Sequence, residues 1–187
     1  MSWPPASAAA IEALCADDLL AETHSIDFKR EVGDSKRARQ QLAANLASFA
    51  TDGGWIVVGF EEHEGDTPRF QPAPVLLDGE RERLDSIAHT LIDPPLRISV
   101  RQLERADGDG YLLVRVPPSP HVLHAVDGRY YGRRDSQKAV IHDADVERLL
   151  RLRAAQQTSI EGTLADESTH APHVDSSYPG STAQLRR

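Results

Sequence analysis

TDGGWIVVGF, residues 51–60, is the stretch that decides how this chain folds. Its last six letters are apolar almost throughout and β-branched in the middle, which is typical of a strand buried on both faces. We therefore expect this strand to lie in the centre of a sheet. Gly53 and Gly54 precede it and are expected to end a helix, because glycine tolerates the left-handed backbone found at helix ends.

The segments around this strand alternate between helical and extended patterns. Apolar residues recur at helical spacing or at every second position, and the DGDG at 107–110 predicts a hairpin. The expected helices span 8–20, 35–51, 80–92 and 143–153, and the expected strands span 25–30, 55–60, 96–103, 111–116 and 129–133. This order predicts a single α+β domain, a mixed sheet with helices packed on it, at residues 8–153. A leader, 1–7, precedes it, and a disordered tail, 154–187, follows because that segment lacks periodicity.

The composition excludes several classes of protein. The chain has 187 residues, a formal net charge of -8 and a single cysteine, Cys15, so it can form no internal disulfide. No run of 18 apolar residues and no secretory signal is present, and we expect a cytoplasmic protein with no membrane partner. The motifs of P-loop ATPases, helical zinc sites and nucleophile elbows are also missing. Because the chain is acidic, any polyanion must bind a local positive patch.

A first group of charged residues surrounds the segment DFKRE, residues 27–31. Alternation places Asp27 and Lys29 on one face of a strand, Glu22 precedes them, and Glu61 directly follows the buried strand. If the two strands are neighbours, three carboxylates and an ammonium group come together. Such a set suits Mg²⁺ or Mn²⁺, and the lysine can stabilise charge on a transferring phosphate. The alternative is that these residues are solvated surface charges.

A second group is the decapeptide RYYGRRDSQK, residues 129–138. It is the most basic stretch of an acidic chain, and its cations can neutralise phosphates while a tyrosine stacks on an unpaired base. The candidate nucleic-acid-binding residues are Arg129, Tyr131, Arg133, Arg134 and Lys138. The alternative is an edge strand whose charges discourage aggregation and whose tyrosines pack inward.

Three motifs in the same order resemble the AlbA-like domain of Schlafen proteins and their bacterial relatives. They are ETHSIDFK at 22–29, SFATDGGWIVVGFEE at 48–62 and YYGRRDS at 130–136. The resemblance runs from about Asp18 to Leu150. Departures from the family's pattern are an aspartate at 27 in place of glutamate, a glutamate at 61 in place of aspartate, and no asparagine before Thr51.

The resemblance implies a divalent-metal-dependent endoribonuclease that acts on tRNA or rRNA, as in the vertebrate members. The implied metal ligands are Glu22, Asp27 and Glu61, with Glu62 as the alternative third ligand. We expect a nucleic-acid-binding domain that favours RNA over DNA. The alternative is a non-catalytic regulator that binds DNA or ATP, as bacterial relatives are often labelled. The vertebrate enzymes pair two such lobes around their groove, so a homodimer of this single lobe would serve as a substitute.

Overall fold

The computed structural model describes residues 3–63, 65, 69–119, 123–151 and 154. The chain divides into two units, Met1–Leu149 and Leu150–Arg187, and the fold described below belongs to the first. The α+β class is confirmed. The tail predicted at 154–187 lies, apart from Ala154, outside the described residues. No helix in the described part of the chain is long and apolar enough to cross a membrane.

Serine residues cap the N-terminal ends of the first two helices. The Oγ of Ser7 accepts a hydrogen bond from the backbone N–H of Ala10, and the Oγ of Ser35 accepts one from Ala38. The helices are α1 (Ala8–Ala16), α2 (Lys36–Ser48) and α3 (Glu80–Thr90), and a further helical segment covers 143–151. The expected helix 8–20 is therefore too long, because Asp18 has a left-handed φ of 52° that ends the helical path.

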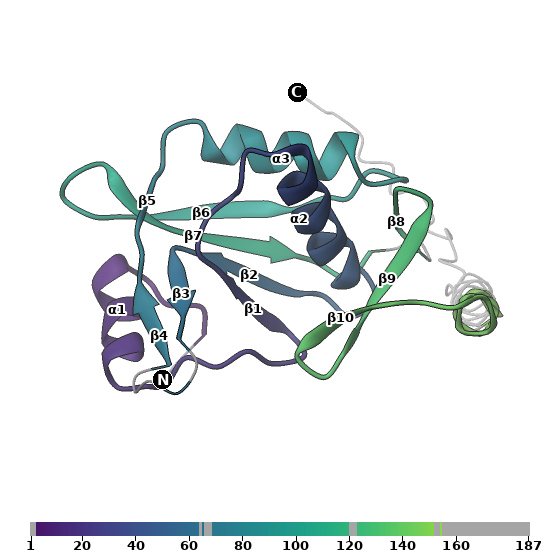
Figure 1. Cartoon of the computed structure of the whole chain (residues 1–187), viewed down its shortest axis with the longest axis horizontal. Coiled ribbons are helices and arrows are strands. Elements are labelled where there is room, and N and C mark those ends of the chain that lie inside the picture. The colour runs from purple at the N-terminus through teal and green to yellow at the C-terminus, as the bar shows by residue number, and fades with distance from the viewer. Residues whose placement is uncertain (1–2, 64, 66–68, 120–122, 152–153, 155–187) are drawn as a thin grey trace, which may run out of the picture. The chain divides into compact units, whose positions relative to one another are not determined.

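One five-stranded sheet carries the fold (Figure 1). Its strands are β1 (Ile26–Lys29), β2 (Gly54–Val58), β5 (Val75–Leu76), β6 (Ser99–Glu104) and β7 (Asp109–Val116). The order is β1-β2-β7-β5, with β6 also paired to β7, and only the β1-β2 pair is parallel. The strand expected at the centre is thus confirmed, since β2 lies between β1 and β7.

Two smaller sheets flank the main one. β3 (Phe60–Glu62) pairs with β4 (Phe70–Pro72), and β9 (Arg129–Arg134) lies between β8 (Ala125–Val126) and β10 (Gln137–Val140). The sequence patterns predicted neither β4 nor β10. Both β9 and β10 contact α2, and Figure 1 shows β9 crossing beside that helix.

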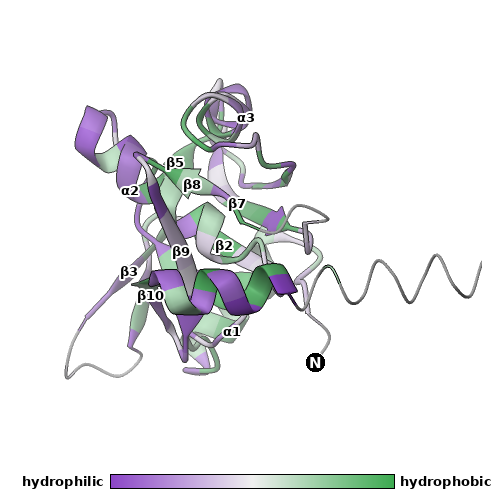
Figure 2. Ribbon diagram, turned by 90° about the vertical axis from the view of Figure 1, so that its right-hand side faces the viewer, coloured by the Kyte–Doolittle hydropathy of each residue, from purple (hydrophilic) through white to green (hydrophobic). Residues whose placement is uncertain are grey.

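The core has two layers, one on each face of β2 and β7. Ile56 and Val58 pack with α2 and α3, whereas Val57 packs on the other face with α1. Figure 2 shows the central strands coloured as hydrophobic. Alternate residues of a strand point to opposite faces, so a strand buried on both sides must be apolar at every position. The composition of residues 55–58 meets that requirement.

A glycine ends β2 two residues before the sequence pattern predicted. Gly59 has a φ of 109°, a conformation that residues with side chains rarely adopt. A Cβ at this position would lie 2.6 Å from Cδ1 of Tyr111. The chain therefore turns after Val58, and Glu61 belongs to β3 and not to a continuation of β2.

Candidate functional site

The polar face of β1 lies at the edge of the main sheet. Asp27 is opposite Ile56 and Lys29 is opposite Val58 in the β1-β2 register, so both side chains lie on the face that carries α2. Phe28 points to the other face and packs with α1. Because β1 is an edge strand of the sheet, its polar side chains lie at the border of the apolar core.

Asp27 is a buried carboxylate held by two cations. It is 5% exposed, and its Oδ2 lies 2.7 Å from Nζ of Lys29. The two groups form an ion pair, but their angles do not allow a hydrogen bond, and Oδ2 has no hydrogen-bond partner in the described structure. Nη1 of Arg133 lies 3.7 Å from Oδ1. A buried charge needs such partners, because leaving water costs it several kcal/mol, roughly.

Glu22 joins Asp27 from the segment before the strand. Its Oε1 accepts the backbone N–H of Phe28 at 3.1 Å, which satisfies a donor on the free edge of β1. Burial raises the pKa of Glu22, and the negative charge and hydrogen bonding of Asp27 raise it further. The Phe28 N–H and the Lys29 ammonium oppose that shift of the pKa. Two carboxylates thus share one site in which protonation of Glu22 is favoured.

Arg133 fastens the β9–β10 hairpin to β1. Its side chain is 1% exposed, and its guanidinium donates to the carbonyl oxygens of Thr23 at 2.9 Å, His24 at 3.3 Å and Ser136 at 2.5 Å. The guanidinium carbon also lies 4.4 Å from the ring centroid of Phe49. Since its donors are engaged inside the protein, this geometry gives Arg133 a positioning role in the described structure.

Lys138 and Tyr131 lie on the same side of the hairpin as Arg133. Nζ of Lys138 donates to the carbonyl of Gln41 on α2 at 3.4 Å and lies 5.5 Å from the centroid of the Tyr131 ring. Burial, and then the positive charge of Lys29, lower the pKa of Lys138, while Asp27 raises it. Tyr131 is half-buried and packs against the core. We call Tyr131, Arg133 and Lys138 the inner face of the hairpin.

The opposite side of the hairpin, its outer face, carries Gly132, Arg134 and Ala139. Arg134 is exposed and, among the described residues, forms no ion pair; the same is true of Arg129 at the start of β9. The five predicted nucleic-acid-binding residues are therefore divided. Two are open to solvent, and three face α2 and β1.

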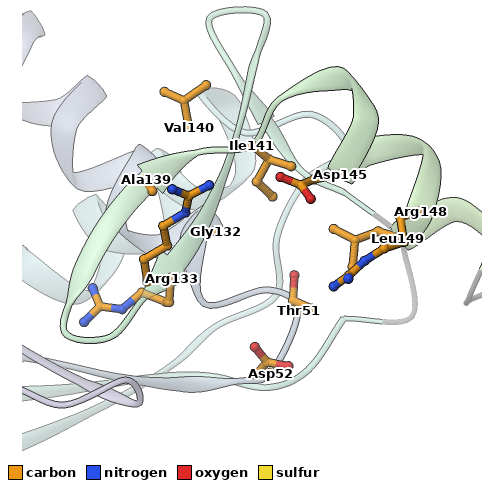
Figure 3. A pocket seen from close by; sticks show the side chains of 11 residues that line it. Thr51, Asp52, Gly132, Arg133, Ala139, Val140, Ile141, Asp145, Arg148 and Leu149 are labelled. Atoms are coloured by element: carbon orange, nitrogen blue, oxygen red, sulfur yellow. The ribbon is translucent and has the colours of Figure 1, made fainter.

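A pocket of about 320 Å³ borders the outer face (Figure 3). Its lining comes from the hairpin, from the segment after α2 and from the helical segment 143–149. The lining residues are Thr51, Asp52, Gly132, Arg133, Arg134, Ala139, Val140, Ile141, Asp145, Arg148 and Leu149. In Figure 3, Arg133 lies on the hairpin side and Arg148 on the opposite side. The pocket joins exposed arginines to an apolar wall, a combination that suits a phosphate with an attached ring.

Glu61 does not join Glu22 and Asp27. Its Oε1 lies 2.7 Å from Nη1 of Arg30, and its Oε2 lies 3.9 Å from Nε2 of His63. Glu62 pairs with Arg69. Across the described residues, no group of three His, Cys, Asp or Glu side chains is placed to hold a metal ion. The expected meeting of three carboxylates is therefore not observed, because the turn at Gly59 carries Glu61 onto β3.

Sequence patterns missed the residues that bring the pocket together. Asp52 lines the pocket, and its Oδ2 lies 3.2 Å from Nε2 of His24, beside β1. Arg148 was expected only as part of a terminal helix. No local signal identifies either residue, because the pocket depends on a hairpin closing over the end of α2. The alternation of β9 did carry a usable signal, since it separates Arg133 from Arg134.

The chain is similar to one protein family and to solved structures of other proteins. A family model described as Schlafen, AlbA_2 matches residues 22–142. The DIP2311 protein from Corynebacterium diphtheriae has a similar structure, with a TM-score of 0.51 and 20% identity over 78% of this chain and 28% of that one. A weaker match, with a TM-score of 0.42 and 24% identity, is titled "N-terminal Domain of Putative ATP-dependent DNA Helicase RecG-related Protein", from Nitrosomonas europaea; it covers 56% of this chain and 71% of that one. No curated protein matches.

Proposed function

The chain belongs to the Schlafen AlbA_2 family, and on this basis we propose that it binds nucleic acid, RNA in preference to DNA, through the outer face of the β9–β10 hairpin. The observation that carries the proposal is the pocket between Arg134 and Arg148, which Asp52 and Asp145 also line but in which neither arginine forms an ion pair with a described acidic side chain. Phosphate contacts supply most of the affinity of sequence-independent binding. Because the chain has a net charge of -8, a polyanion is expected to approach at a locally positive site such as this pocket.

In this proposal the two faces of the hairpin have complementary roles. On the inner face, Arg133 ties the hairpin to the carbonyls of Thr23 and His24, and this fixes the position of Arg134. The outer face then offers Arg134 to a phosphate, while Ile141 and Leu149 offer apolar surface to a base or sugar. Rigid placement reduces the entropy lost on binding, so a buried positioning arginine can support an exposed binding one.

We further propose that the bound RNA is cleaved beside Glu22 and Asp27. The observation that favours cleavage is the meeting of these carboxylates with Lys29, where burial raises the pKa of Glu22. A raised pKa makes the carboxyl group of Glu22 a better proton donor or acceptor above the usual range of a carboxyl group. Mg²⁺ or Mn²⁺ is often held by one or two carboxylates together with substrate phosphate, so Glu22 and Asp27 would hold the ion without Glu61. A bound ion would supply charge stabilisation at the transferring phosphate.

The binding test measures the affinity of the wild type and of variants at exposed arginines for a labelled RNA and for a DNA of the same sequence. Fluorescence anisotropy reports the binding. We expect the double variant Arg134→Ala, Arg148→Ala to bind more weakly and to lower the dependence of log K on log salt by about 0.7 per lost contact on a single strand. Arg97→Ala, another exposed arginine, serves as the control. Unchanged affinity and salt dependence in the double variant would refute the proposal. Tighter binding of the DNA would refute the RNA preference.

The cleavage test incubates the protein with total tRNA, with Mg²⁺ or Mn²⁺ and with chelator. We expect cleavage only with the metal, and loss of cleavage in Glu22→Gln and in Asp27→Asn. If RNA binds but is never cut, the non-catalytic regulator becomes the better description, and binding of ATP or duplex DNA is measured next. A homodimer stays a prediction, and sedimentation at several protein concentrations tests it.

A further inference from the structure

A second groove, with a mixed polar and apolar lining, lies between α2 and α3. It has a volume of about 360 Å³. Lys36, Arg39 and Gln40 line it from α2, and Ser86 lines it from α3, over the apolar floor of Ile87. No sequence motif pointed to this place, and the proposed function makes no use of it.

The positive charge of this groove is only partly neutralised. Arg83, which also lines it, pairs with Asp34 at 2.7 Å and with Glu80 at 3.0 Å. Lys36 and Arg39 are exposed, and in the part of the chain that the structure describes neither forms an ion pair. Two cations three residues apart lie on one face of a helix, so they point to the same ligand. An anionic ligand therefore fits this groove.

The groove is a short distance from the β9–β10 hairpin. Nζ of Lys138 binds the carbonyl of Gln41, and Arg37, one turn before Gln41, lies on the same side of α2. Arg37 is exposed and unpaired among the described residues. Since a helix rises 1.5 Å per residue, Lys36 lies only about 7.5 Å along the axis from Gln41. Figure 2 shows α2 as strongly hydrophilic over its exposed part. Positive side chains thus continue from the hairpin around α2.

We propose that Lys36, Arg37 and Arg39 form a second phosphate-binding surface, which holds the backbone of a nucleic-acid strand that extends beyond the hairpin. This inference rests on the proposed function, because the strand is placed first by the outer face of the hairpin. Short strands fill only the hairpin site. Longer strands pass around α2 and gain the contacts of the groove, so affinity rises with strand length.

The test uses the charge-reversal variant Lys36→Glu, Arg39→Glu and single-stranded RNAs of about four and about sixteen nucleotides, the range of lengths that small binding domains cover. Glutamate is favoured near the beginning of a helix, so the variant is expected to fold, and circular dichroism checks this. For the long strand we expect affinity to fall at least about tenfold and the salt slope to fall by about 1.4, or about 0.7 for each lost contact. For the short strand we expect no change.

The control is Arg81→Glu, an exposed arginine on α3 that does not line the groove. Long-strand affinity that is unchanged in the groove variant but reduced by Arg134→Ala would overturn this inference and leave the proposed function standing. Equal losses for short and long strands, or equal losses in Arg81→Glu, would show a general effect of charge and would also overturn it. If Arg134→Ala has no effect on either strand, the proposed function itself fails.

Discussion

The two faces of the β9–β10 hairpin use the same residue types for opposite purposes. Arg133 on the inner face is 1% exposed and donates to three carbonyl oxygens beside a buried aspartate. Arg134, the next residue, is exposed and unpaired among the described residues. A basic stretch is therefore not a single binding surface. Where it forms a strand, neighbouring side chains point to opposite faces, so Arg133 turns toward the protein and Arg134 toward solvent.

The largest loss of stability is expected when Arg133, the arginine of the inner face, is removed. Arg133→Ala leaves the Asp27 carboxylate with Lys29 as its one ion-pair partner among the described residues, and we expect the free energy of unfolding to fall by about 3 kcal/mol. Urea denaturation monitored by circular dichroism measures it. A loss below about 0.5 kcal/mol, the range of ordinary surface substitutions, would mean that Arg133 does not hold the hairpin in solution.

A smaller loss is expected when the inner charge is kept but its shape is changed. Arg133→Lys retains a cation near Asp27 but cannot reach all three carbonyl oxygens, because an ammonium lacks the planar fork of donors. We expect the free energy of unfolding to fall by about 1.5 kcal/mol, or roughly one charged hydrogen bond. The same denaturation experiment applies. Full stability in this variant would show that charge alone matters at the position.

The carboxylate pair below the inner face predicts a dependence on pH. The raised pKa of Glu22 means that the folded state binds its proton more tightly than the unfolded state. Stability from this group is therefore complete at low pH and falls as pH rises from the ordinary pKa of 4.5 through the raised value. Glu22→Gln, which keeps an oxygen for the Phe28 N–H, should remove this fall.

This prediction is measured as the difference in unfolding free energy between wild type and Glu22→Gln, with chelator present at each pH. We expect the wild type to lose stability relative to the variant as pH increases above about 4.5, the ordinary pKa of glutamate here. A difference that stays constant, or one that changes in favour of the wild type, would contradict the raised pKa.

The smallest effect on stability is expected on the outer face. Arg134→Ala removes an exposed side chain with no described ion pair, so the free energy of unfolding should change by no more than about 0.5 kcal/mol. Affinity for RNA should fall in the same protein. If Arg134→Ala destabilises the fold as much as Arg133→Ala, the division between the two faces is wrong.

Local patterns predicted the elements near the centre of the fold well. The apolar run at residues 55–58 became β2, and α2, capped by Ser35, begins where the helix expected at 35–51 begins. Short strands such as β4 and β8 were missed, because two or three residues carry too little periodicity to identify a strand. The paired position of Glu22 and Asp27 followed from the same local alternation together with the family motif.

By itself, the sequence determined the α+β class, the central strand and the polar face of β1, since each depends on hydrophobic period and on neighbours in the chain. Only the tertiary structure decided which charged residues meet. The turn at Gly59 carries Glu61 to Arg30 and away from Asp27, and the hairpin brings Arg133 to a strand more than 100 residues earlier. The physical reason is that the position of a charged residue in the sequence does not specify which other charges it will meet. Its role depends on the burial and partners that the fold supplies, and these come from segments far apart in sequence.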